Sequence, residues 1–212
     1  MGVVVFLGPP GVGKGTQASY LNDRLGASHI STGALLREEI ETRSSLGLEI
    51  KDVMARGDLV DDDQLFQCLE NKLERVEGLS GKLLLLDGVP RTRSQVTRLD
   101  GVLAKHGLKV GLALNLSAPV EQLIERFAMR WSCRQCGQIY SYQSAPVAGH
   151  VCSKCGGSDS LVRRKDDEPE SVRHRFKVFE QETAPLVSEY EDRGILRVVN
   201  GLGEPELSLI HI

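Results

Sequence analysis

A glycine-rich segment near the N-terminus has the residue types and spacing that bind phosphate. Gly8-Pro-Pro-Gly-Val-Gly-Lys-Gly-Thr16 follows a short apolar run and precedes a helical pattern, which is the context of a phosphate-binding loop. Glycines let backbone N–H groups turn toward an anion, and the lysine can reach the β and γ oxygens of a nucleotide. The usual pattern has Ser or Thr directly after the lysine, whereas Gly15 intervenes here. A plain glycine-rich turn is the alternative. We expect nucleotide phosphates to bind at Gly8, Pro9, Pro10, Gly11, Val12, Gly13, Lys14, Gly15 and Thr16.

Four of the five cysteines form two Cys-x-x-Cys pairs. The pairs Cys133/Cys136 and Cys152/Cys155 are separated by fifteen residues, which is the spacing of a zinc ribbon. Four thiolates complete a tetrahedron and leave no position for water, so we expect the zinc to be structural. Redox-active or merely reduced thiols are the alternative. The fifth cysteine, Cys68, lies in a helical pattern and is predicted to be a small buried side chain.

The elements that must position these groups alternate between strands and helices. Apolar runs predict buried parallel strands at Val3–Leu7, Leu83–Leu86, Val110–Leu116 and Ile195–Val199. Helical spacing is found at Gly15–Leu25, Asp62–Val76, Ser94–Lys105 and Pro119–Met129. This alternation predicts a doubly wound α/β sheet, with ligands at the carboxyl ends of its strands. Asp87 directly follows one of these strands, where a carboxylate could orient Mg²⁺ through its water shell.

Two stretches interrupt the alternation and are predicted to be insertions into the core. Residues 31–60 show helical spacing without a strand, and residues 131–163 are rich in Cys, Gly and Ser. The chain has 212 residues and a net charge of −3, which suits one globular core and gives no support for nucleic-acid or membrane binding. The N-terminal apolar run is too short for a signal peptide or a membrane span, so we expect a cytosolic protein.

Further motifs follow the phosphate loop along the chain. They are Ser31–Arg37, Leu86–Thr92 with Gln95, Arg126 and Arg130 on one helix face, and Arg164–Asp167 followed by Arg175. With the Gly-Lys-Gly-Thr loop, these motifs resemble the long-lid adenylate kinases among the nucleoside monophosphate kinases, over residues 1 to about 201. The resemblance implies a P-loop NTPase core (1–30, 61–130 and 165–212), a helical AMP-binding flap (31–60) and a zinc-ribbon lid (131–164). It also implies a monomeric enzyme that moves a phosphoryl group between ATP and AMP with Mg²⁺.

The resemblance implies roles for individual residues as well. The catalytic set comprises Lys14, Asp87, Arg91, Arg126, Arg130, Arg164 and Arg175. Arg126 and Arg130 would join the phosphate loop in binding ATP, with Arg126 stacked on its base. The AMP set comprises Thr32, Arg37, Asp58, Val60, Gly88, Arg91, Gln95, Arg164 and Arg175. Arginine forks suit phosphate oxygens, whereas Thr32 and Gln95 would read the adenine of AMP.

The chain departs from the family pattern at three positions and at its end. Ala34 stands where the family usually has Asp, Val89 replaces a Phe, and Met129-Arg-Trp131 replaces Gly-Arg-Arg at the lid hinge. We expect these changes to affect the turnover rate and the motion of the lid more than the type of reaction. The family continues into a closing helix after Asn200-Gly201, whereas eleven residues follow here. We therefore expect a truncated chain with a foreign tail at residues 207–212 and an uncovered apolar strip on the core.

Two other classes of function compete with this interpretation. A nucleic-acid-binding zinc-ribbon motor is disfavoured by the acidic balance and by the lack of interleaved aromatic and basic residues. A GTP-dependent switch would need an Asn-Lys-x-Asp segment after a strand, but Asn115 is followed by Leu116 and Ser117. A test of which nucleoside monophosphate accepts phosphate from ATP separates the three classes.

Overall fold

The core of the molecule is a parallel sheet. The computed structural model describes residues 2–76, 82–141 and 151–202. Within these residues five parallel strands lie in the order β2, β3, β1, β4, β8. Their bounds are β1 Gly2–Leu7, β2 Ser28–Ser31, β3 Leu84–Asp87, β4 Lys109–Ser117 and β8 Leu196–Asn200. The predicted doubly wound parallel sheet is confirmed. The central strand β1, which lies between β3 and β4, leads directly into the phosphate loop.

The edge strand β2 is absent from the sequence prediction, in which a helical stretch began at Ser31. The segment Ser28–Ser31 contains a single aliphatic residue, Ile30, so it lacks the apolar run that marks the other strands. It is a strand because it pairs along β3, with Ser31 opposite Asp87, and pairing can override a weak local preference. This register places the start of the first insertion beside the carboxyl end of β3.

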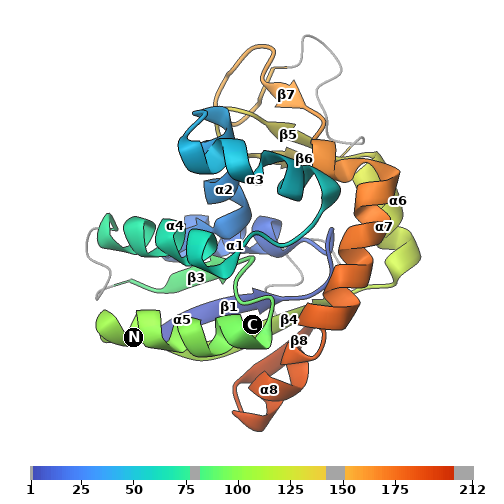
Figure 1. Cartoon of the computed structure of the whole chain (residues 1–212). Coiled ribbons are helices and arrows are strands. Elements are labelled where there is room, and N and C mark those ends of the chain that lie inside the picture. The colour runs from blue at the N-terminus through green and yellow to red at the C-terminus, as the bar shows by residue number, and fades with distance from the viewer. Residues whose placement is uncertain (1, 77–81, 142–150, 203–212) are drawn as a thin grey trace.

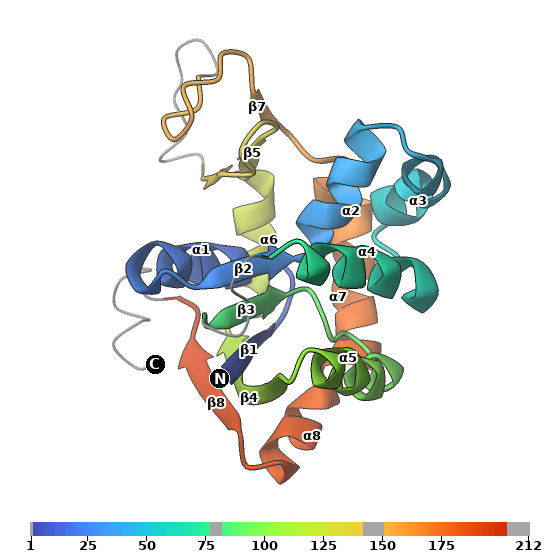
Figure 2. The same ribbon diagram turned by 90° about the vertical axis from the view of Figure 1, so that its left-hand side faces the viewer.

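Helices cover both faces of the sheet (Figure 1; Figure 2). One face packs against α1 (Lys14–Leu25), α6 (Val120–Ala128) and α7 (Pro169–Val178). The other packs against α4 (Asp62–Glu74), α5 (Arg93–Lys105) and α8 (Leu186–Asp192). The ends of α1, α4, α5 and α6 lie within two residues of the predicted bounds. No helix in the described part of the chain is both long and apolar enough to cross a bilayer.

Cys68 differs from its prediction. It lies on α4 and is half-buried, packed against the core rather than enclosed by it. The buried face of α4 is formed by Leu65, Phe66, Leu69 and Leu73, and Cys68 lies at the margin of that stripe, where a helical side chain remains partly exposed.

Two insertions stand above the sheet in Figure 1. The flap comprises α2 (Thr32–Glu41) and α3 (Ser45–Arg56), between β2 and α4. The lid is an antiparallel sheet in the order β6 (Ile139–Tyr140), β5 (Trp131–Cys133), β7 (Leu161–Val162). A 3₁₀ turn at Lys165–Asp167 leads from the lid into α7, and a π-helical segment at Phe179–Thr183 follows α7. The expectations for the C-terminal tail concern residues 203–212, which lie outside the described residues.

Candidate active site

The phosphate loop requires glycine at its first positions. Gly8 has φ +127°, and a Cβ there would lie 2.3 Å from the carbonyl oxygen of Leu116. Gly11 has φ +79°, and its Cβ would lie 2.7 Å from the ring of Phe127 on α6. The left-handed conformation and the close approach therefore both exclude a side chain at these positions. The result is a tight turn between β1 and α1, with N–H groups at the start of α1 facing the space where an anion would bind.

Lys14 is the first residue of α1 and is turned back along the loop. Its Nζ donates to the carbonyl oxygens of Gly8, at 2.7 Å, and Pro9, at 2.9 Å. Burial lowers the pKa of Lys14 to about 8. The nearby charge of Asp87 raises this pKa, whereas the charges of Arg91 and Arg175 lower it further. A partly buried ammonium group that donates to carbonyl oxygens and has several cations near it is well placed to bind a phosphate anion.

Asp87 lies at the carboxyl end of β3, beside the phosphate loop. Its Oδ2 accepts a hydrogen bond from Ser31 Oγ at 3.4 Å, and its carbonyl oxygen accepts one from Thr32 Oγ1 at 3.4 Å. A Cβ at Gly15 would lie 3.2 Å from Asp87 Oδ2. The carboxylate therefore faces the first turn of α1. One carboxylate next to a phosphate site is the donor set that Mg²⁺ commonly uses, because it keeps most of its water and takes the remaining oxygens from phosphate.

Basic side chains from distant segments converge beyond the loop. The cluster contains Lys14, Arg37, Arg91, Arg130, Arg164 and Arg175, with the carboxylates Asp87, Asp166 and Asp167 among them. Burial, opposed in part by Asp166, lowers the pKa of Arg175 to about 10. Burial and the charges of Arg37 and Arg130 lower the pKa of Arg164 to about 9. With six basic groups against three carboxylates, the centre has an excess of positive charge that an anionic ligand would neutralise.

Asp166 and Asp167 orient two of these arginines. Arg130 donates from Nε to Asp167 Oδ2 at 2.9 Å and forms a second contact from Nη2 to Oδ1. Arg175 Nη1 lies 2.8 Å from Asp166 Oδ2 and donates to the Asp166 carbonyl oxygen at 3.1 Å. Burial raises the pKa of Asp166, but the charge of Arg175 and its neighbours outweighs burial and lowers it. The sequence prediction omitted both acids as site residues, although they form part of the Arg164–Asp167 motif.

Phe127 joins the phosphate loop to the arginine cluster. The guanidinium carbons of Arg130 and Arg175 lie 4.4 and 5.2 Å from the centroid of its ring, within the range of cation–π attraction. The same ring occupies the space beside Gly11. A single buried aromatic side chain therefore contacts both the phosphate loop and two of the arginines.

A cleft lies between the flap, the carboxyl end of β3 and α7, and its empty space, open solvent included, is about 560 Å³. It is lined by eight of the nine residues predicted for AMP: Thr32, Arg37, Asp58, Val60, Gly88, Arg91, Gln95 and Arg175. The ninth, Arg164, belongs to the cationic cluster and donates from Nε to Ser132 Oγ at 3.2 Å. A second cleft of about 500 Å³ includes Gly8, Pro10 and Lys14. Both clefts share Gly88, Arg91 and Arg175, so they adjoin at the arginines.

Gln95 and Arg91 are fixed by hydrogen bonds in the first cleft. Gln95 is buried, its Oε1 accepts from Arg91 N at 2.7 Å, and its Nε2 donates to Asp62 Oδ1 at 2.7 Å. Arg91 Nε donates to Gly88 O at 2.9 Å, and Thr183 Oγ1 donates to Arg91 O at 2.9 Å. The Gln95 amide retains one donor and one acceptor position for a ligand. Asp62 and Thr183 are supporting residues that no sequence motif indicated.

Arg126 lies on the outer side of the phosphate loop. Its Nη1 donates to the carbonyl oxygens of Gly201, at 3.1 Å, and Val12, at 3.5 Å. The Val12 side chain is buried in the core, so only the backbone of that residue remains for a nucleotide. Arg126 therefore connects the loop to the end of β8, apart from the cationic cluster.

The lid brings its four cysteines together. The four sulfur atoms lie within 4.8 Å of one another, and the Cys133–Cys155 and Cys136–Cys152 pairs are separated by 3.7 and 3.6 Å. A tetrahedral zinc–thiolate site with bonds of about 2.3 Å would have sulfur separations of roughly 3.8 Å. These sulfurs are too far apart for disulfides. The residues fit a zinc ion.

A tyrosine donates to the most buried of the thiols. Tyr140 Oη lies 3.1 Å from Cys152 Sγ and 3.0 Å from Ser153 Oγ, and it also accepts from the backbone N–H of Lys154. Because Ser153 and Lys154 can both donate to the phenol oxygen, its single proton is available to the sulfur. Burial raises the pKa of Cys152, but this hydrogen bond and those of nearby N–H groups outweigh burial and bring it to about 6.

Comparison with known proteins is consistent with this arrangement. Residues 6–195 match the family profile described as Adenylate kinase. Proteins named adenylate kinase from Archaeoglobus fulgidus and Thermodesulfovibrio yellowstonii are 38% and 41% identical, over 96% and 94% of this chain and 92% of each relative. One from Anaeromyxobacter dehalogenans is 40% identical over 96% of this chain and 94% of its own length.

Proposed function

The chain belongs to the adenylate kinase family, and on that premise we propose that it reversibly transfers the γ-phosphoryl group of ATP to AMP, with Mg²⁺, to give two ADP. The observation that carries this proposal is the cationic cluster at the junction of two clefts, one at the phosphate loop and one at the flap. Phosphoryl transfer requires two nucleotides in line and neutralisation of the charge on the moving group. Basic groups at the junction supply that charge.

The residues divide into three tasks. The phosphate loop and Lys14 hold the phosphates of ATP, while Arg37 and Arg91 hold the phosphate of AMP. Arg130, Arg164 and Arg175 surround the phosphoryl group in transit, with Arg130 and Arg175 oriented by Asp167 and Asp166. Such fixed charges are effective because they need no rearrangement as the transition state forms.

The remaining roles concern the adenine and the metal. The Thr32 hydroxyl and the spare positions of the Gln95 amide favour AMP as the acceptor, since an unpaired buried group costs about 1–3 kcal/mol when a wrong base binds. Asp87 would hold Mg²⁺ through water, and the bound ion would neutralise charge on the phosphates. A cytosolic location and a monomeric state are further proposals, to be tested by cell fractionation and sedimentation.

A coupled assay tests the proposed function. ATP and Mg²⁺ are supplied with AMP, GMP, UMP or CMP in turn, and formation of the diphosphate is measured. We expect AMP to be the best acceptor and ADP to be the product. Faster turnover with another monophosphate would refute the assignment of the acceptor, and ATP hydrolysis without any acceptor would favour a motor or a switch.

The lowered pKa of Lys14 predicts a pH-dependent affinity for ATP. In the free enzyme the Lys14 ammonium loses its proton above about pH 8, whereas bound phosphate favours the charged form. Binding above pH 8 must therefore take up a proton, and the KM for ATP should rise up to about tenfold between pH 8 and pH 9. Calorimetry in two buffers of different ionisation enthalpy measures the uptake. Lys14→Arg is the control, because it keeps its charge and should remove the pH dependence; proton-independent binding by the unaltered enzyme would contradict the prediction.

We also propose that the lid binds one structural zinc through Cys133, Cys136, Cys152 and Cys155, with Tyr140 as an outer hydrogen-bond donor. Such outer partners typically contribute about 10- to 100-fold to metal affinity. Tyr140→Phe should therefore weaken zinc binding by about that factor in a chelator competition. Tyr190→Phe is a matched control, because Tyr190 is also buried but lies in the main core. Equal zinc affinity in both variants would contradict the role of Tyr140.

A further inference from the structure

The end of the flap is docked against α7. The loop from Gly57 to Val60 follows α3 and lines the AMP cleft, and Gly57 also lines the second cleft. Ser171 Oγ on α7 donates to Ala55 O at 2.8 Å. Gly57 has φ +85°, and a Cβ there would lie 2.5 Å from Arg175 Cγ. The loop therefore approaches α7 at the helical turn that carries one of the central arginines.

A contact between the side chains of Asp58 and His174 lies beside this point of close packing. His174 Nε2 lies 2.6 Å from Asp58 Oδ1, and Arg56 Nε donates to Asp58 Oδ2 at 2.9 Å. Hydrogen bonds from Arg56 and His174 lower the pKa of Asp58, so the group is a carboxylate near neutral pH. A carboxylate only accepts hydrogen bonds, which requires the proton of His174 on Nε2 in either charge state of the ring.

The contact joins the two walls of one cleft. Asp58 belongs to the flap wall, while His174 directly precedes Arg175, which lines the opposite wall. The two residues are 116 positions apart in the sequence, and His174 itself lines neither cleft. The separation of the walls determines how well a nucleotide touches both of them, so a contact at their edge affects the affinity of that cleft.

We propose that His174 is a positioning residue for the acceptor site, which holds the Gly57–Val60 loop against α7 through Asp58. This inference rests on the proposed function, since it assigns the flap cleft to AMP. The pair is partly exposed, with side-chain exposures of 42% and 37%, so its effect is the small one of an exposed side-chain contact. Among its described contacts, His174 touches neither the phosphate loop nor Lys14. Most of the Gly57–Val60 loop lines the flap cleft, so we expect the main effect on AMP.

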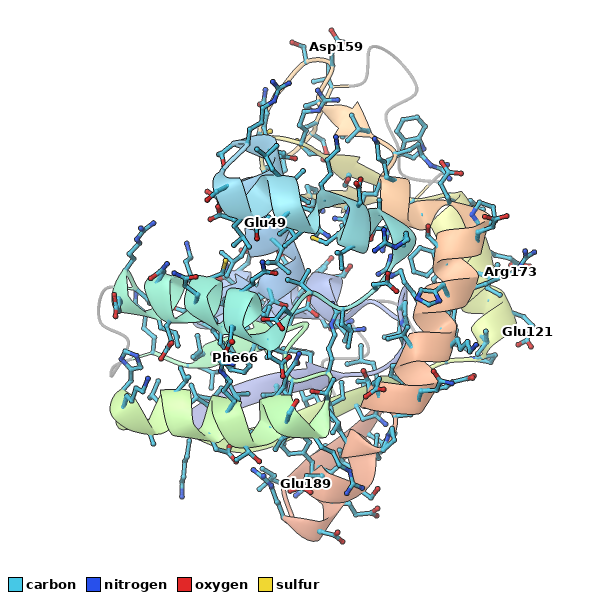
Figure 3. The ribbon with its side chains drawn as sticks, viewed as in Figure 1. Glu49, Phe66, Glu121, Asp159, Arg173 and Glu189 are labelled. Atoms are coloured by element: carbon cyan, nitrogen blue, oxygen red, sulfur yellow. The ribbon has the colours of Figure 1, made fainter. Side chains whose placement is uncertain are left out.

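Steady-state kinetics of His174→Ala tests the proposal. The KM for AMP should rise roughly two- to fivefold at saturating ATP, while the KM for ATP and the kcat stay within about twofold. His174→Gln retains an N–H donor and should restore most of the AMP affinity. Arg173→Ala is the control, because Arg173 is exposed on the outer side of the same helix (Figure 3). In the Asp58→Asn background, His174→Ala should add little, since the partner is already weakened.

The outcomes separate this inference from the proposed function. An unchanged KM for AMP in His174→Ala, or an equal rise in both KM values, would overturn the role of His174 and leave the kinase assignment intact. A lower unfolding temperature with both KM values unchanged would show a merely structural contact. If His174→Ala does not fold, His174→Leu decides the question, because leucine fills similar space but cannot donate to Asp58: a raised KM for AMP supports the role, and an unchanged one overturns it. Failure of AMP to accept phosphate in the unaltered enzyme would refute the proposed function instead.

Discussion

Lys14→Met is expected to lower kcat by roughly three orders of magnitude, the scale seen when a central charge is removed from a phosphoryl-transfer site. Methionine matches the lysine side chain in length but cannot donate to phosphate. The Lys14 ammonium is partly buried and has no carboxylate within hydrogen-bonding distance among its described contacts. Its loss therefore removes charge from the transition state without breaking an ion pair.

Stability provides the control for this substitution. At Lys14, desolvation and repulsion by Arg91 and Arg175 together outweigh the attraction of Asp87, so methionine should leave the unfolding midpoint equal or higher. Circular dichroism and calorimetry check the fold, and kcat is measured with ATP and AMP at saturation. Unfolded Lys14→Met protein would show that the lysine mainly holds the loop through Gly8 and Pro9. A kcat near that of the unaltered enzyme would contradict its role in transfer.

The parts of the candidate site whose geometry can be read from the sequence are local motifs. The phosphate loop is fixed by glycines whose conformation no other residue adopts easily, as at Gly8 and Gly11. The cysteine pairs Cys133/Cys136 and Cys152/Cys155 carry their geometry in their spacing. In both cases the information lies in one short stretch of the sequence, of nine residues for the loop and 23 for the cysteines, so the pattern can be recognised without the tertiary structure.

The parts that were missed depend on tertiary contacts. β2 is a strand because it pairs with β3, and its own sequence around Ile30 is too polar to reveal it. Thr183 supports Arg91 from 92 positions away, and the partner of His174 lies 116 positions away. Spacing within a motif contains no information about such pairs. Such pairs can be identified only from the tertiary structure.

The structure also shows the surroundings of the residues that, in the sequence analysis, differ from the family pattern. Val89 is fully buried in the core cluster. Ala34 is exposed on α2. Trp131 packs with the buried side chains of the lid, and Arg163 lies 5.8 Å from the Trp131 ring centroid and donates to Ala128 O at 2.7 Å. The hinge of the lid is therefore joined to the end of α6 by contacts particular to these residues.

Cys152→Ser is expected to abolish stoichiometric zinc binding and to unfold the lid at a lower temperature than the core. Structural zinc sites contribute about 10–16 kcal/mol of apparent binding energy in small domains, and the lid has few other buried groups to replace it. Its described core cluster consists of Cys133, Tyr140, Cys152 and Leu161, with Trp131 beside it. Two of those groups are proposed zinc ligands, so loss of the ion should remove much of what holds the lid together.

The consequence for activity follows from where the lid joins the core. Arg130 precedes β5, and Arg164 follows β7 and donates to Ser132 in β5, so an unfolded lid misplaces two cations of the transfer centre. The kcat of Cys152→Ser should therefore fall strongly, while the phosphate loop, built on β1 and α1, still binds ATP. Metal analysis, calorimetry and ATP titration measure the three effects. Cys68→Ser is the matched control, because Cys68 lies on α4 outside the cysteine cluster and should keep about one zinc per chain. Full zinc content in Cys152→Ser, or four freely titrating lid thiols in the unaltered native protein, would refute the zinc ribbon.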